Sequence, residues 1–337
     1  MLHKKIKELF SSSVTSVTSA ISNYAVNPNK DLTRNKKLPP DKLITFMVSE
    51  GSSSTKNELL DFFNMDIQAP TASAFNQQRA KLKPEALEAV FKLFNSSVNS
   101  IDKPSDYRFL AADGSTFTFF SKPNFATPEY YVSGSHSTKG FYSMHLNACY
   151  DLVKHTYTNA IIQPVHSKDE FRAFCDMVDC HDILPDSKNV FIGDRGYCSY
   201  NNMAHVINKG QFFLFCTKDI HSKGLVGNFD FPKEEFDITV KVTLVRSHPK
   251  KLTPIDGYKR FIDKATSFDF IEYGSEYTYE LSFRFVRFPL SDSSYECIVT
   301  NLPADEFPSE CIKQLYFTRW GIESSFRKLK YTIGLCI

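Results

Sequence analysis

Two aspartates that each follow a short apolar run place the strongest constraint on the fold of this chain. Residues 107–112 have the pattern of a buried strand, which ends at Asp113 before a turn that contains Gly114. Residues 189–193 form a second apolar run, which ends at Asp194 with a glycine on either side. Aspartates at the ends of buried strands commonly form active sites in α/β sheets. Each one alone could equally be an ordinary turn residue.

The elements around these aspartates follow a definite order. Apolar spacing predicts three strands, a helix, a strand, a helix and a strand. They span residues 107–118, 143–152, 157–163, 169–179, 189–194, 200–208 and 211–216. This order matches the RNase H-like fold, an α/β fold with a mixed sheet flanked by helices. In that fold the first and fourth strands are neighbours, so we expect Asp113 and Asp194 to lie together.

The last helical stretch holds an acid among cations. Tyr316, Arg319, Glu323 and Lys330 are spaced by three, four and seven positions, which at about 100° per residue places them on one helical stripe. The neighbouring stripe is apolar and consists of Cys311, Leu315, Ile322, Phe326 and Leu329. Alone, this is the pattern of any amphipathic helix. Together with the two aspartates, a carboxylate beside cations is typical of a site for two Mg²⁺ ions next to a polyanion.

The three segments resemble the DDE transposases of the insertion-sequence-four family. The family signature is Tyr, two residues, Arg, three residues, Glu, six residues, Lys, and the four residues from Tyr316 to Lys330 match every spacing. The wider string YFTRWGIESSFRKLKYTIGL also resembles the family, as do ADGST at Asp113, GDRGY at Asp194 and the N-terminal TASAFNQQRAKLKPEAL.

This resemblance implies a DNA transposase that hydrolyses DNA at the 3′ ends of an insertion element and transfers those ends to target DNA. Asp113, Asp194 and Glu323 would be the catalytic acids and the ligands of two Mg²⁺ ions, which Mn²⁺ could replace. The implied partners are transposon-end DNA with its terminal inverted repeats, target DNA, and a second copy of the chain in a synaptic homodimer.

Phosphate contacts near the transposon end are implied for Tyr316, Arg319 and Lys330. Hairpin-forming relatives also stack a Trp from a β insertion on a flipped base, whereas the single Trp here is Trp320, inside the signature. A Phe or Tyr of the insertion could replace it, or the hairpin step is absent.

The chain stops at Ile337, just after the signature, so we expect a truncated copy. The alternative functions are a non-catalytic DNA-binding remnant or transposition inhibitor, and a metal nuclease without strand transfer.

Composition adds little about function. The net charge is only +2, but residues 1–45 hold eight Lys and Arg against three acids, which fits either a phosphate-binding surface or a solvated basic terminus. The eight cysteines form no spaced framework, and Cys175 with Cys180 and His181 lacks a second ligand pair, so we expect reduced thiols. Neither a membrane-spanning apolar run nor a signal peptide is evident. We expect a soluble, cytoplasmic, nucleoid-associated protein.

Four regions follow from these patterns. Residues 1–105 are a helical DNA-binding region, 106–217 the first part of the RNase H-like core, 218–305 a β-rich insertion, and 306–337 the truncated C-terminal helix with the signature. Polar residues of the first region suit either DNA contact or an exposed helix: Gln77, Gln78, Arg79 and Lys81. In the insertion we predict strands over 236–245, 277–288 and 295–300, and a basic loop that is either a DNA clamp or a solvated hairpin tip: Arg246, His248, Lys250 and Lys251.

Overall fold

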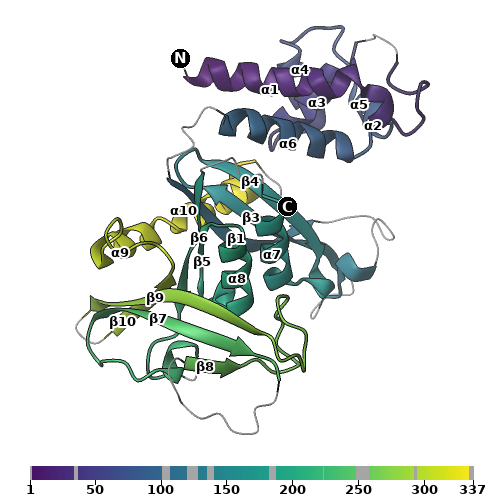
Figure 1. Cartoon of the computed structure of the whole chain (residues 1–337). Coiled ribbons are helices and arrows are strands. Elements are labelled where there is room, and N and C mark those ends of the chain that lie inside the picture. Colours follow the sequence, from purple (N-terminus) through teal and green to yellow (C-terminus); the bar gives the residue numbers. More distant parts are fainter. Residues whose placement is uncertain are drawn as a thin grey trace. The chain divides into compact units, whose positions relative to one another are not determined.

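The computed structural model describes residues 2–33, 37–100, 107–119, 128–134, 140–181, 187–222, 224–247, 258–291 and 294–333. The chain divides into two compact units, which Figure 1 shows in the colours of the sequence. Unit 1 comprises residues 1–103 together with 327–336, and unit 2 comprises residues 104–326. Within the described ranges, no helix is both long enough and apolar enough to cross a membrane.

Unit 1 is built from helices, as its apolar spacing predicts. They are α1 (Leu2–Ser19), α2 (Ile21–Tyr24), α3 (Pro40–Ser49), α4 (Thr55–Phe62), α5 (Ala72–Arg79) and α6 (Glu85–Asn99). The side chains of Ser54 and Thr71 cap α4 and α5 by accepting hydrogen bonds from backbone amides of the first turns. The centre of the unit is a cluster of fully buried side chains that includes Leu43, Ile44, Phe46, Leu59 and Phe75.

Unit 2 contains a mixed sheet flanked by helices. Its strands are β1 (Tyr107–Phe119), β2 (Tyr131–Val132), β3 (Phe141–Asp151), β4 (Thr156–Pro164), β5 (Lys188–Gly193), β6 (Phe212–Thr217), β7 (Phe236–Val245), β8 (Tyr258–Phe261), β9 (Thr278–Ser291) and β10 (Ser294–Thr300). Within the described part of the chain these ten strands form one sheet in the order β2-β3-β1-β5-β6-β10-β9-β7-β8, and β4 also pairs with β3.

The first half of this sheet is RNase H-like, as predicted. β1, β3 and β4 pair antiparallel, and β5 then pairs parallel with β1 and with β6. Helix α7 (Glu170–Asp179) connects β4 to β5, and α8 (Tyr200–Asn208) connects β5 to β6. The first and fourth predicted strands are therefore neighbours, which confirms the expected pairing.

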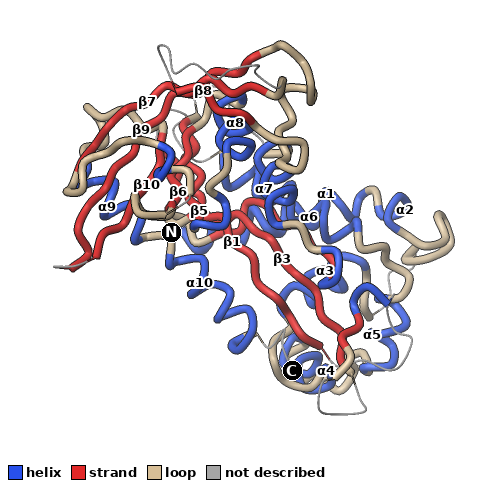
Figure 2. Tube along the Cα trace, turned by 90° about the horizontal axis from the view of Figure 1, so that it is seen from below, coloured by secondary structure: helices blue, strands red, loops and turns tan. Residues whose placement is uncertain are grey.

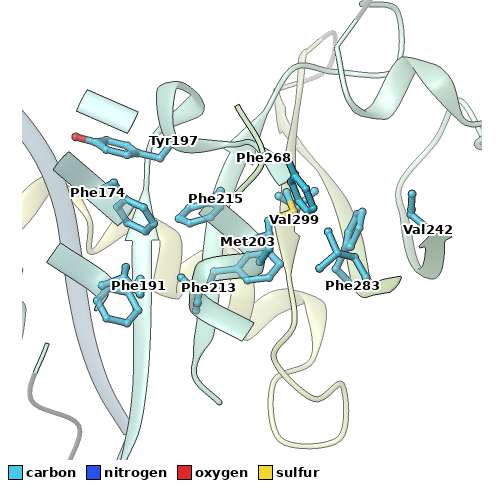
Figure 3. Close-up of a cluster of buried hydrophobic side chains, with 14 of the residues drawn as sticks. Phe174, Phe191, Tyr197, Met203, Phe213, Phe215, Val242, Phe268, Phe283 and Val299 are labelled. Atoms are coloured by element: carbon cyan, nitrogen blue, oxygen red, sulfur yellow. The ribbon is translucent and has the colours of Figure 1, made fainter. Parts of the chain in front are cut away.

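Alternating side chains of the central strands give the sheet two buried faces. On one face, the rings of Phe191 and Phe215 pack against Phe174 of α7 with centroids 6.1 and 5.6 Å apart (Figure 3). On the other face, Ile192 belongs to a cluster with Ile312 of α9 (Ser309–Phe317). Each such side chain contributes about 1.5–3 kcal/mol through burial. Helices α7 and α8 thus cover one face, and α9 covers the other.

The strands of the predicted insertion extend the core sheet, because β10 pairs antiparallel with β6 and is followed by β9, β7 and β8. Arg246, the first residue of the predicted basic loop, is not exposed as either interpretation of that loop requires. Arg246 is buried and donates hydrogen bonds to four backbone carbonyls, so it is neither a DNA clamp nor a solvated tip. His248, Lys250 and Lys251 lie outside the described residues.

The prediction of one continuous signature helix is wrong. The stretch is divided into α9, α10 (Trp320–Arg327) and the π-helix η5 (Lys328–Thr332). At the joint, the amides of Thr318 and Arg319 bond to carbonyls three residues earlier, and the Thr318 hydroxyl bonds to the Leu315 carbonyl at 2.6 Å. These local bonds compete with the regular helical pattern. The apolar stripe changes accordingly, since Cys311 is exposed whereas Ile312 and Tyr316 are buried.

Candidate active site

Asp113 lies in the middle of β1, not at the end of a strand. It pairs with Ala148 of β3, and the strand continues to residue 119. The predicted strand over 107–118 is therefore confirmed, and the predicted turn at Gly114 is wrong. The strand continues because β3 pairs with it well beyond Ala111, where its pairing with β5 ends. Gly114 is needed for close packing, since a Cβ there would lie 2.4 Å from Nε2 of His145.

Asp194 directly follows β5 and begins the short 3₁₀ helix η3 (Arg195–Tyr197). Its Oδ1 accepts a hydrogen bond of 2.7 Å from the amide of Gly196, which fixes the carboxylate. In the parallel pair of β1 and β5, Ala111 lies opposite Ile192. Asp113 and Asp194 each come two residues later, and residues two apart share a face of a sheet. Both acids therefore lie on the face that α9 covers.

Glu323 reaches the same face from the first turn of α10. Figure 2 shows α10 on the opposite side of β1 from α7 and α8. The Nη2 atom of Arg319 lies 3.0 Å from Oε1 of Glu323. Arg319 is 8% exposed, so this cation is held inside the protein beside an acid. The signature thus supplies one acid and one buried cation as a pair.

Electrostatics shows that the three acids and Arg319 share one neighbourhood. Burial is the main cause that raises the pKa of Asp113 from 3.8 to about 6. The amide of Gly114, which donates to Oδ1 at 2.8 Å, and the Arg319 guanidinium act in the opposite direction. The charges of Asp194 and Glu323 raise this pKa further. The sequence prediction that these acids lie within each other's electrostatic reach therefore fits the structure.

This donor set fits a divalent metal ion. Three carboxylates supply the hard oxygen ligands that Mg²⁺ and Mn²⁺ prefer. Burial, with a smaller contribution from the two other acids, raises the pKa of Asp113, and a bound cation would favour its ionised form. Within the described part of the chain, the ligand atoms of Asp113, Asp194 and Glu323 do not all lie within 4.8 Å of one another. Among the described residues, a different group has all its ligand atoms within 4.8 Å of one another, namely Cys175, His205 and Asp269.

Both the sequence and the fold of this chain are similar to known transposases. Residues 104–335 match the family model described as transposase DDE domain. The chain belongs to this family. Among solved structures, it is similar to a piggyBac transposase synaptic complex with hairpin DNA, determined by cryo-electron microscopy, at a TM-score of 0.45 and 9% sequence identity. That match covers 98% of this chain and 66% of the other, so the chain spans about two thirds of the solved protein. No curated protein matches the sequence.

The other two signature residues of this DDE domain have different surroundings. Tyr316 is 6% exposed and packs in the cluster under α9, where burial raises the pKa of its hydroxyl above the ordinary value. Lys330 lies in η5, which belongs to unit 1. Neither observation tests whether these residues contact phosphates, so both contacts stay predictions.

Three further residues lie near the aspartates, and no sequence pattern had assigned them a role: Tyr197, His145 and Glu170. Tyr197 is 2% exposed, and burial raises the pKa of its hydroxyl well above the ordinary value, with Asp113, Glu170 and Asp194 adding to the shift. His145 lies beside Gly114, and its Nε2 is 3.1 Å from Oε1 of Glu170. The GDRGY string could have indicated Tyr197, whereas the pair of His145 and Glu170 depends on packing between β3 and α7.

Proposed function

We propose that this protein is a DNA transposase of an insertion sequence, related to the insertion-sequence-four family. It cuts DNA at the ends of its element and joins those ends to target DNA. The observation that carries this proposal is the set of three acids from β1, the end of β5 and α10. They share one electrostatic neighbourhood with a buried arginine, in a chain of the transposase DDE domain family.

Asp113, Asp194 and Glu323 would hold two Mg²⁺ ions, or Mn²⁺ in their place. When bound, these ions supply a Lewis acid next to the scissile phosphate and lower the pKa of water. The side chains themselves have distinct tasks. Asp194 is held in place by the Gly196 amide, and Glu323 by Arg319. Asp113, with a pKa of about 6, is mostly ionised at neutral pH and can act as a ligand there.

Arg319 has a second task in this proposal. Its guanidinium can fork onto a phosphate of the transposon end, which offsets the negative charge that DNA brings to an acidic site. Lys330 adds a point charge to the phosphate backbone, and Tyr316 supports the helix that carries the arginine. The predicted phosphate contact of Tyr316 would require its buried hydroxyl to become accessible.

We propose residues 1–105, which include the helices α1–α6 of unit 1, as the DNA-binding region. The other proposed regions are the first part of the core (106–217), the insertion (218–305) and the signature segment (306–337). Support comes from a hollow of about 750 Å³ beside the capped start of α5. Its wall includes three lysines and a glutamine, namely Lys30, Lys37, Lys81 and Gln78. Ammonium groups and amides are suited to phosphates and base edges.

The proposed assembly is a homodimer that holds two inverted-repeat ends and a target DNA, working on nucleoid DNA in the cytoplasm. Hairpin formation in such an assembly would require an aromatic ring to stack on a flipped base. Tyr277, 82% exposed in the segment before β9, and Trp320, 57% exposed at the start of α10, offer rings for this contact.

The test is cleavage of a DNA fragment that carries the element's own ends, with purified full chain and Mg²⁺. We expect a nick at the terminus that chelator abolishes. Asp194→Asn should bind the same DNA without cutting it, because the amide keeps the shape but not the charge. Asp305→Asn, at an exposed acid, is the matched control and should cut normally. Cleavage by Asp194→Asn at the parent rate would refute the assigned site.

A further inference from the structure

A second group of ligand-type side chains lies away from the three acids. Cys175 is on α7, His205 is on α8, and Asp269 is in the segment between β8 and β9. One ligand atom of each lies within 4.8 Å of the other two. Cys175 is 1% exposed and His205 is 7% exposed, whereas the side chain of Asp269 is 41% exposed. We propose that these three residues bind one Zn²⁺ ion, which joins the segment before β9 to the helices behind the sheet.

The surroundings of His205 support a metal ligand. Its Nδ1 lies 3.0 Å from Oδ1 of Asp179, and its Nε2 lies 2.9 Å from Oδ2 of Asp269. Metal-binding histidines usually donate the other ring N–H to a carboxylate, which fixes the tautomer and the ring orientation. With Asp179 at Nδ1, the nitrogen left for the metal is Nε2, which faces Oδ2 of Asp269.

The mixture of donors selects the ion. A thiolate, an imidazole and a carboxylate suit Zn²⁺, whereas Mg²⁺ takes oxygen ligands. Zinc binds cysteine as the thiolate, so the Cys175 thiol releases its proton when the ion binds. The exposed side of Asp269 leaves the fourth tetrahedral position to water.

Neighbouring polar groups complete the site. Asn202 accepts from the Cys175 thiol at 3.3 Å, and Asn201 donates to Oδ2 of Asp269 at 3.2 Å and approaches the Cys175 sulfur at 3.7 Å. Arg172 lies 3.5 Å from the same Asp269 oxygen and is the cation that zinc would compete with. Without metal, these groups form a hydrogen-bonded network around His205 and Asp269.

Cobalt binding distinguishes the proposed metal site from a hydrogen-bonded network that binds no metal. The full chain is freed of metal with chelator under reducing conditions and titrated with Co²⁺, which replaces Zn²⁺ and absorbs in the near ultraviolet when a thiolate is bound. We expect a thiolate-to-cobalt band that saturates at one equivalent, is bleached by Zn²⁺ and is unaffected by millimolar Mg²⁺. A wild-type protein without this band would overturn the proposal and leave the three residues as a hydrogen-bonded network.

Three variants assign the ligands. Cys175→Ser should lose the band, whereas Cys180→Ser, at an exposed cysteine that caps the same helix, should keep it. Asp269→Asn changes a partly exposed side chain and should fold normally with affinity for Co²⁺ reduced at least 10-fold. Persistence of the band in Cys175→Ser, or parent affinity in Asp269→Asn, would contradict the assignment. Metal held by carboxylates alone gives no thiolate band, so the outcome is independent of the proposed DNA cleavage.

Discussion

At the scale of single residues, the surroundings of Asp113 disfavour its ionised carboxylate. It is held in the middle of β1, and burial together with the charges of Asp194 and Glu323 makes its ionised form costly. Arg319 and the Gly114 amide offset only part of this cost, since the pKa still reaches about 6. A cation bound next to Asp113 would reduce the remaining cost of its ionised form.

Asp113→Asn should stabilise the metal-free protein at pH 7.5. The folded pKa of about 6 lies above the ordinary value of 3.8, so the folded state carries the cost of a buried charge above pH 6. Between pH 6 and pH 4 the folded state takes up the proton first, and the cost disappears. The melting temperature of the variant in chelator should exceed that of the parent at pH 7.5, and the difference should vanish near pH 4. A difference that does not change with pH would contradict the shifted pKa.

Arg319→Ala should weaken binding to transposon-end DNA and reduce the slope of log affinity against log salt by about one, because one phosphate neutralisation is lost. Arg319→Lys should restore the slope but not the full affinity, since ammonium cannot fork onto phosphate. Lys313→Ala, on the neighbouring α9, is the control. Salt titrations in which all three variants behave like the parent would exclude the phosphate contact.

At the scale of elements, the corner between β5 and η3 sets the position of Asp194. Gly193 ends the strand, and a Cβ there would lie 2.9 Å from the Tyr197 Cβ and 3.1 Å from the Phe215 ring. Tyr197 is buried, so it cannot simply move aside. The close packing between β5 and η3 thus fixes the position of Asp194 at the end of the strand next to β1.

Gly193→Ala should destabilise the protein by about 1–3 kcal/mol through overpacking, and it should reduce cleavage by displacing Asp194. Gly51→Ala is the control, because its Cβ would meet only the flexible Glu58 carboxylate at 3.1 Å, and its effect should stay within about 0.5 kcal/mol. Urea unfolding of both variants measures the difference. Equal midpoints for the two variants would show that the corner is not tightly packed.

Local sequence patterns predicted most helices and strands. They failed where contacts between residues far apart in the sequence determine the local structure. Eight of the ten strands were predicted, but β2 and β8 were not, because two and four residues are too short to show a period. Gly114 resembled a turn residue, although pairing with β3 keeps it in a strand. The helix break at Thr318 is accompanied by a bond from its hydroxyl to the Leu315 carbonyl, which apolar spacing does not indicate. The group of Cys175, His205 and Asp269 is spread over the chain, so spacing could not show it.

At the scale of the whole molecule, one sheet connects the RNase H-like strands to those of the insertion. β10 lies next to β6, and Ile298 of β10 is fully buried in the cluster that also contains Ile192 and Ile312. The insertion therefore contributes to the hydrophobic core that contains Ile192. A substitution that destabilises its strands should destabilise the whole of unit 2.

Ile298→Ala should destabilise unit 2 by about 2–5 kcal/mol, since it leaves a cavity in the shared core. Trp320 is the single tryptophan and lies in unit 2, so its fluorescence in urea reports this change. Ile162→Ala, at a side chain 57% exposed on β4, should shift the midpoint little. A Trp320 transition unaffected by Ile298→Ala would mean that the insertion strands unfold separately.

The central claim is that Asp113, Asp194 and Glu323 act as one metal-dependent site, and the most direct measurement is the nicking rate of single and double variants. On end DNA with Mg²⁺, Asp113→Asn, Asp194→Asn and Glu323→Gln should each lose roughly 10³-fold or more while still binding DNA. Residues that act as a unit are strongly non-additive, so Asp113→Asn combined with Glu323→Gln should be no slower than either alone. A single variant that cuts at the parent rate, or losses that multiply in the double variant, would contradict the claim.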